Sequence, residues 1–167
     1  YKFDSSFYYR LPRVTLGQAE TTDAGRVRNA VKQMLDLAKG RAGYCLVLGG
    51  VDGSLALELV RQSDFQVILL DDRPEVIRNV RSNLDAAGVY GARATAKLCK
   101  LSDKTFGPML FNLIVSERHL LGGQLPVDSA ADAFRSLAPA GGTLVLGQSG
   151  DFASAQNWFG KVDARTI

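Results

Sequence analysis

Short apolar runs alternate with amphipathic segments along most of the chain. Five runs have the length and composition of buried strands, at residues 44–48, 65–70, 92–97, 111–115 and 142–147. Between and after them, apolar residues recur at helical spacing over about 23–38, 54–62, 75–87, 130–137 and 152–159. Strands that alternate with helices in this way predict an α/β domain with a doubly wound, mostly parallel sheet and helices on both faces.

A glycine-rich turn joins the first predicted strand to the helix that follows it. Gly49, Gly50 and Gly53 stand in this turn, and Asp71 and Asp72 end the next strand. Such a turn brings backbone N–H groups and the positive end of a helix dipole to one point. An acidic residue at the tip of the neighbouring strand can accept hydrogen bonds from a ribose there. The pattern predicts a site for a nucleoside-containing cofactor.

Several motifs occur in a fixed order from residue 23 to residue 150. They are the glycine turn, Asp71-Asp72-Arg73-Pro74-Glu75 with its helix, the fourth strand, and the approach 137–142 to the fifth strand. This ordered set resembles the core of the class I S-adenosylmethionine-dependent methyltransferases. The resemblance implies a Rossmann-like, methyltransferase-like fold and S-adenosylmethionine as the cofactor.

The resemblance also implies which residues would hold this cofactor. Gly49, Gly50, Val51 and Gly53 would back its methionine end, Asp71 would hold the ribose, and Leu98 and Cys99 would flank the adenine, with Asp72 and Ser116 as further cofactor-binding candidates. Neighbouring strand residues point to opposite faces, so only one of the two aspartates would meet the cofactor. The match of Asp71-Asp72-Arg73-Pro74-Glu75 to the family favours Asp71 as the ribose ligand.

Two residues after the fourth strand are candidates for catalysis. His119 lies where the resemblance places residues that face the substrate, and it is a candidate general base for the methyl acceptor. The alternative for His119 is an exposed loop histidine without a role. Glu117 either binds an acceptor amine or caps the loop. The acceptor is not identified, and a single histidine without a CxxC motif makes a metal site unexpected.

Some positions depart from the family pattern. Val47 stands where an acidic residue is usual, and Val51 replaces the middle glycine. A β-branched side chain resists positive φ, so the turn must be built differently and leave less room for the methionine half. About 20 residues follow the fifth strand. The sheet is therefore expected to lack the last two strands of the family or to be completed by another part.

These departures keep two alternatives open. One is a non-catalytic Rossmann-like module of a larger protein, and the other is an NAD(P)-binding domain. Gly50, Gly53 and Ala56 have the G-x-x-G-x-x-A spacing of short-chain dehydrogenases, but no tyrosine has a lysine four residues later.

Composition adds limits on partners and domains. The chain is 46% hydrophobic and 22% charged, and its apolar runs are strand-sized, so no membrane span is expected. A net charge of +3 could favour nucleic acid. That partner is disfavoured because no aromatic residues are interleaved with the charges along the first predicted helix, whose basic residues more simply form a solvated face. Residues 1–22 are expected to form an arm or the end of a preceding domain, and residues 23–167 the methyltransferase-like domain, with flanking domains of a longer chain as partners. The compartment is unassigned, or cytoplasmic if the methyltransferase interpretation holds.

Overall fold

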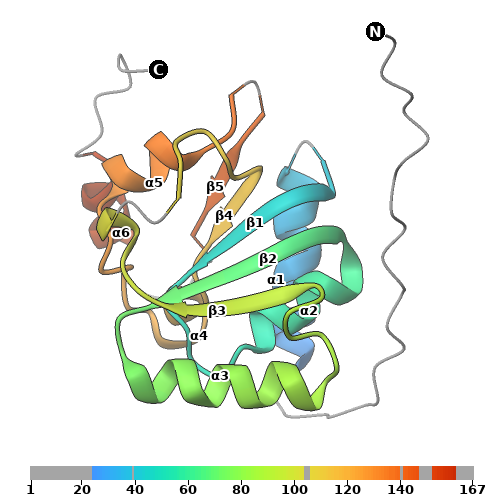
Figure 1. Cartoon of the computed structure of the whole chain (residues 1–167). Helices are drawn as coiled ribbons and strands as arrows, with labels where there is room; N and C mark the ends of the chain where they lie inside the picture. The colour runs from blue at the N-terminus through green and yellow to red at the C-terminus, as the bar shows by residue number, and fades with distance from the viewer. Residues whose placement is uncertain (1–23, 39, 104–105, 140, 147–151, 161–167) are drawn as a thin grey trace, which may run out of the picture.

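A five-stranded parallel sheet forms the centre of the protein (Figure 1). The computed structural model describes residues 24–38, 40–103, 106–139, 141–146 and 152–160. The strand order is β3-β2-β1-β4-β5, and every neighbouring pair is parallel. The strands are β1 (Ala42–Leu48), β2 (Asp64–Asp71), β3 (Ala94–Leu98), β4 (Leu113–Val115) and β5 (Thr143–Val145). The predicted fold class is confirmed, with β4 and β5 shorter than the apolar runs that predict them.

The helices also follow the predicted order, with one addition. They are α1 (Ala24–Leu37), α2 (Ser54–Gln62), α3 (Pro74–Ala86), α4 (Glu117–Gly122), α5 (Ala130–Ser136) and α6 (Phe152–Phe159), and η1 (Leu101–Asp103) is a single 3-10 turn. The sequence predicts a loop where α4 lies. The Ser116 hydroxyl caps α4 by accepting a hydrogen bond from His119 N at 3.2 Å, and Gly123 ends it in the left-handed conformation.

Both faces of the sheet are buried, which explains why the first strand is a continuous apolar run. Cys45 and Val47 of β1 pack into a core with α1, α2 and α3. Leu46 and Leu48 face the opposite way and pack into a second core with η1, α5 and α6. All four residues are fully buried. Figure 1 shows the first group of helices on one side of the sheet and α5 and α6 on the other.

The order of the strands decides where a ligand site can form. The chain runs outward from β1 through β2 to β3, and then returns to place β4 on the other side of β1. In open parallel sheets, ligands bind outside the carboxyl ends of the strands at such a reversal. The segments that follow β1, β2 and β4 therefore meet at one place.

Some sequence-based predictions fall outside the described residues. The arm or preceding domain at residues 1–22 and the end of the fifth apolar run at 147 belong to this group. Within the described residues the sheet has five strands. None of the helices described here combines the length and the apolar character that crossing a membrane requires.

Candidate functional site

The turn between β1 and α2 is built on two glycines with left-handed backbone. Gly49 has φ 72° and Gly53 has φ 86°, whereas Val51 is not among the residues with positive φ. Val51 therefore has an ordinary backbone conformation, and Gly49 and Gly53 supply the left-handed positions of the turn. Val51 is also 41% exposed, and the expected loss of room for the methionine half stays a prediction.

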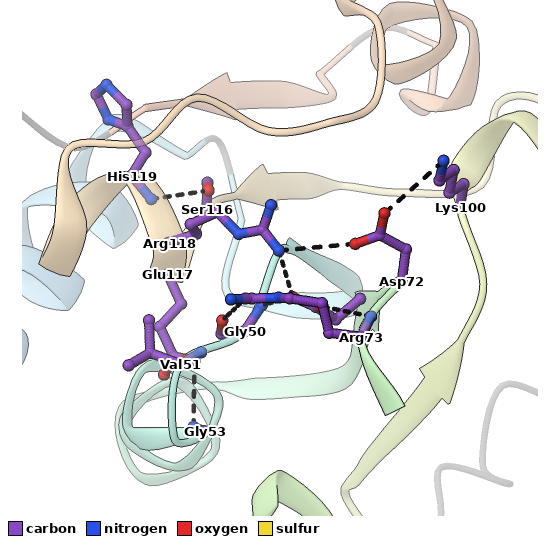
Figure 2. A network of polar contacts seen from close by, with 11 residues as sticks. Gly50, Val51, Gly53, Asp72, Arg73, Lys100, Ser116, Glu117, Arg118 and His119 are labelled. Atoms are coloured by element: carbon purple, nitrogen blue, oxygen red, sulfur yellow. Dashed lines mark hydrogen bonds and ion pairs between the residues drawn. The ribbon is translucent and has the colours of Figure 1, made fainter. Parts of the chain in front are cut away.

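A carboxylate of the chain itself occupies the N-terminus of α2. Glu117, the first residue of α4, is fully buried. Its Oε2 accepts hydrogen bonds from the backbone N–H groups of Val51 at 2.6 Å and Gly53 at 3.1 Å. Its Oε1 accepts one from the N–H of Leu55 at 2.8 Å. These are N–H groups that the sequence predicts to face a cofactor. In the structure they bind Glu117 instead, as Figure 2 shows for Val51 and Gly53.

Glu117 is therefore a residue that holds the glycine turn. Desolvation raises the pKa of its carboxyl above the ordinary value, while the hydrogen bonds from Leu55 and Val51 act in the opposite direction. The predicted role of binding an acceptor amine is not supported by this position, because both carboxylate oxygens are already bound within the chain.

Asp71 lies at the tip of β2 beside the same turn, and its side chain is completely buried. Its Oδ1 accepts hydrogen bonds from N and Nε of Arg73 at 2.8 and 3.0 Å. Its Oδ2 accepts from Gly50 N at 2.8 Å and from Nη2 of both Arg73 and Arg118 at 3.0 Å. Burial would raise the pKa of Asp71, but the hydrogen bonds from Arg73 and Gly50 and the charge of Arg118 hold it below its ordinary value. Asp71 is an ionised acceptor where the ribose ligand is predicted.

Arg118 connects the tips of β2 and β4. Its side chain is 11% exposed, and its Nη2 lies 3.7 Å from Oδ1 of Asp72. Its backbone N–H donates to the carbonyl of Gly49 at 3.1 Å, which fixes α4 against the turn. Consecutive helical residues point about 100° apart. Figure 2 accordingly shows Glu117 directed at the glycine turn and Arg118 directed at Asp72.

The space between these residues is small. A cavity of about 10 Å³ lies at the carboxyl ends of the strands, which is room for about one water molecule. Known ligand pockets usually measure about 300–1,000 Å³. The cavity is lined by Gly49, Leu70, Asp71, Asp72, Cys99, Lys100, Arg118, Val127 and Asp128. The structure therefore brings Gly49, Asp71, Asp72 and Cys99 together around a space much smaller than a usual ligand pocket.

Of the remaining predicted cofactor-binding residues, Asp72 and Cys99 line this cavity, whereas Leu98 and Ser116 do not. Leu98 pairs with Asp71 in the sheet and is 50% exposed. The N–H of Cys99 donates to the backbone carbonyl of Asp71 at 3.1 Å. Asp72 lies 3.7 Å from the Nζ of Lys100 as well as from Arg118. Ser116 is fully buried and its hydroxyl caps α4.

His119 does not face this group. It lies in the first turn of α4 and is 4% exposed, so it is not the exposed loop histidine of the alternative prediction. Its Nδ1 has no hydrogen-bond partner among the described residues. Figure 2 shows its ring directed away from Asp72 and from the glycine turn. Its position does not support the predicted role as a general base at this site.

Two residues of the site, Arg73 and Arg118, are not among those that the sequence predicts. Arg73 donates three hydrogen bonds to Asp71 and one to the carbonyl of Gly50 at 2.9 Å. Its place two residues after Asp71 is a usable signal, since a side chain at this distance can bend back onto the strand tip. Arg118 is 47 positions from Asp71, and no local pattern links the two residues.

Comparison with solved structures finds the same arrangement of elements in other proteins. A candidate S-adenosyl-L-methionine-dependent methyltransferase from Methanococcus maripaludis matches with a TM-score of 0.61 and 17% identity, over 90% of this chain and 76% of that chain. A SAM-dependent O-methyltransferase from Thermotoga maritima matches with a TM-score of 0.56 and 17% identity, over 86% and 49%. A cyclopropane synthase from Mycobacterium tuberculosis matches with a TM-score of 0.51 and 20% identity, over 70% and 40%.

These similarities concern the fold. No family model matches the sequence, and no curated protein matches it significantly. The chain spans about three quarters of the first of these structures and less than half of each of the other two. Identities of 17–20% leave the reaction open. The chain has the fold of the class I S-adenosylmethionine-dependent methyltransferases.

Proposed function

We propose that this chain is the adenosyl-ligand-binding domain of an S-adenosylmethionine-dependent methyltransferase whose methyl acceptor is not identified. The observation that carries the proposal is the Asp71 carboxylate, buried and ionised, 2.8 Å from Gly50 N at the edge of the glycine turn. A carboxylate at this place in such folds accepts hydrogen bonds from ribose hydroxyls, and here a hydroxyl would replace one of the donors that Asp71 already binds. On this proposal the protein is expected in the cytoplasm.

Other residues near Asp71 take roles that fit the same ligand. Leu98, half-exposed beside Asp71, would pack against adenine together with Cys99. Gly49 and Gly50 offer backbone without side chains where the methionine half would lie. A Cβ on Gly50 would come within 3.1 Å of Leu69 and Val76, so this residue has to be glycine for close packing. Methyl transfer depends mainly on placing donor and acceptor, so this proposal needs no further catalytic group.

A second candidate function is a non-catalytic module that keeps the fold. The small volume of the cavity, about 10 Å³, favours it. Side chains of the protein itself also occupy both features that would bind a ligand. Glu117 binds the N-terminus of α2, and two arginines bind Asp71.

Calorimetric titration with S-adenosylhomocysteine, S-adenosylmethionine and NAD separates these functions. We expect micromolar binding of the adenosyl ligands and at least tenfold weaker binding by Asp71→Ala, because the ribose loses its charged acceptor. Asp64→Ala is the matched control, since Asp64 lies exposed at the opposite end of β2. Circular dichroism verifies that each variant is folded at the titration temperature.

Three other outcomes of the titration would support a different function or a different site. Binding of NAD alone would support the NAD(P)-binding alternative. Binding of none of the three ligands would contradict the methyltransferase proposal and support the non-catalytic module. Adenosyl binding that is equally weakened by Asp71→Ala and Asp64→Ala would remove Asp71 from the site.

A further inference from the structure

Asp71 has no free position for a ribose. A carboxylate offers about four lone-pair positions on its two oxygens. Asp71 already accepts five hydrogen bonds, from Gly50, Arg73 and Arg118. A ribose hydroxyl can therefore bind only where one of these donors leaves.

Arg118 is the donor held least firmly. The N–H of Gly50 belongs to the turn itself, and Arg73 binds Asp71 three times and the carbonyl of Gly50 once. The side chain of Arg118 makes one hydrogen bond to Asp71 and a longer ion pair with Asp72. Its Nε is buried and has no hydrogen-bond partner among the described residues. This donor has lost its contact with water without gaining a hydrogen bond in the protein, which is unfavourable. Arg118 is therefore the arginine with fewer hydrogen bonds to Asp71 that a ligand would have to replace.

Arg118 also lies where a ligand would enter. It lines the cavity together with Gly49. A Cβ placed on Gly49 would lie 3.0 Å from Cβ and 3.2 Å from Nε of Arg118. The arginine therefore fills the space beside the turn that the proposed site gives to the methionine half of the ligand.

We infer that Arg118 determines which adenosyl ligand this site accepts. The ligand binds only when Arg118 leaves Asp71, and the site then favours the neutral thioether S-adenosylhomocysteine over the cationic sulfonium S-adenosylmethionine. The inference rests on the proposed function, because it concerns the same site.

The selectivity follows from the charge of the displaced side chain. Asp72 lies 3.7 Å from Arg118 and its side chain is 31% exposed, so it can hold the guanidinium near the cavity after Asp71 is released. S-adenosylmethionine differs from S-adenosylhomocysteine by one methyl group and one positive charge on sulfur. Like charges close together in a partly desolvated site repel more strongly than in water. The bulk of the Arg118 side chain would weaken the binding of both ligands, whereas its charge would weaken the binding of the sulfonium ligand only.

Two variants separate bulk from charge. Arg118→Gln removes the charge and shortens the side chain, and Arg118→Lys keeps the charge but loses the planar fork. The control is Arg78→Gln, which removes the same charge from an exposed position on α3. Binding of both ligands is measured by calorimetry and by the fluorescence of Trp158. This is the only tryptophan of the chain, and its Nε1 donates at 3.1 Å to the carbonyl of Asp128, which lines the cavity.

We expect Arg118→Gln to bind S-adenosylhomocysteine at least tenfold more tightly than the unaltered protein, about 1.4 kcal/mol. The preference for the thioether over the sulfonium ligand should persist in Arg118→Lys and disappear in Arg118→Gln. Arg78→Gln should leave both affinities unchanged. Thermal melting followed by circular dichroism verifies that the variants are folded.

Each of the other possible results contradicts either the inference alone or the proposed function together with the inference. If the unaltered protein binds both ligands and Arg118→Gln changes neither affinity, the inference is wrong and the proposed function stands. The inference is equally wrong if the ratio of the two affinities is the same in all four proteins. If neither the unaltered protein nor Arg118→Gln binds either ligand, the proposed function fails and the inference fails with it.

Discussion

Replacing Glu117 with alanine is expected to lower the free energy of unfolding by about 3–5 kcal/mol. The substitution leaves the N–H groups of Val51, Gly53 and Leu55 without their acceptor. Each buried donor without a partner costs about 1–3 kcal/mol, and water that enters the vacated space recovers part of the loss. Chemical denaturation followed by circular dichroism measures the change.

Two further variants show whether the contacts of Glu117, and not merely its charge, cause this loss. Glu117→Gln keeps the shape and one acceptor oxygen, so its expected cost is about 1–2 kcal/mol. Glu75→Ala also removes an acidic residue from the first turn of a helix, but Glu75 is exposed. Its expected cost is below about 1 kcal/mol. Equal losses for Glu117→Ala and Glu75→Ala would contradict the role of Glu117 in holding the turn.

The fold could be predicted from the sequence because its signals are local. The run at 44–48 is apolar at every position, and a strand buried on both faces needs that pattern. The helix at 75–87 shows both its start at Pro74 and its apolar stripe. Helix α4 has six residues and no room for a stripe. The sequence therefore predicts a loop there, and only the structure identifies the helix.

The place of the site could be predicted, but its small volume could not. The glycine turn and Asp71 both follow parallel strands, so they had to meet at one edge of the sheet. The bonds that fill the site join residues far apart in the chain. Glu117 is 62 positions from Leu55, and Arg118 is 47 positions from Asp71. These pairs form because α4 starts directly at the tip of β4. Its first two side chains, Glu117 and Arg118, point in different directions, one to the glycine turn and the other to Asp71. Neither composition nor periodicity carries that information.

Replacing Asp71 with alanine is expected to cost about 3–5 kcal/mol of unfolding free energy, comparable to the loss at Glu117. The change leaves the guanidinium of Arg118, whose side chain is 11% exposed, without its nearest carboxylate. Removing one partner of a buried ion pair is costly because the other charge stays desolvated. Arg118→Ala should cost less, because Asp71 keeps Arg73 and Gly50. The double variant Asp71→Ala/Arg118→Ala should lose at least about 1 kcal/mol less than the sum of the single losses.

The pH dependence of stability tests the charge of the Asp71 carboxylate without changing the shape of the side chain. The pKa of Asp71 is lowered in the folded protein, so the unfolded chain binds its proton more readily. The stabilisation is therefore complete above the unfolded pKa of about 3.9 and is lost as the pH falls through the folded pKa. Asp71→Asn cannot titrate there, and its stability should approach that of the unaltered protein as the pH falls below about 4. A constant difference between the two proteins across this range, or additive losses in the double variant, would show that the Asp71 charge does not hold Arg118 in place.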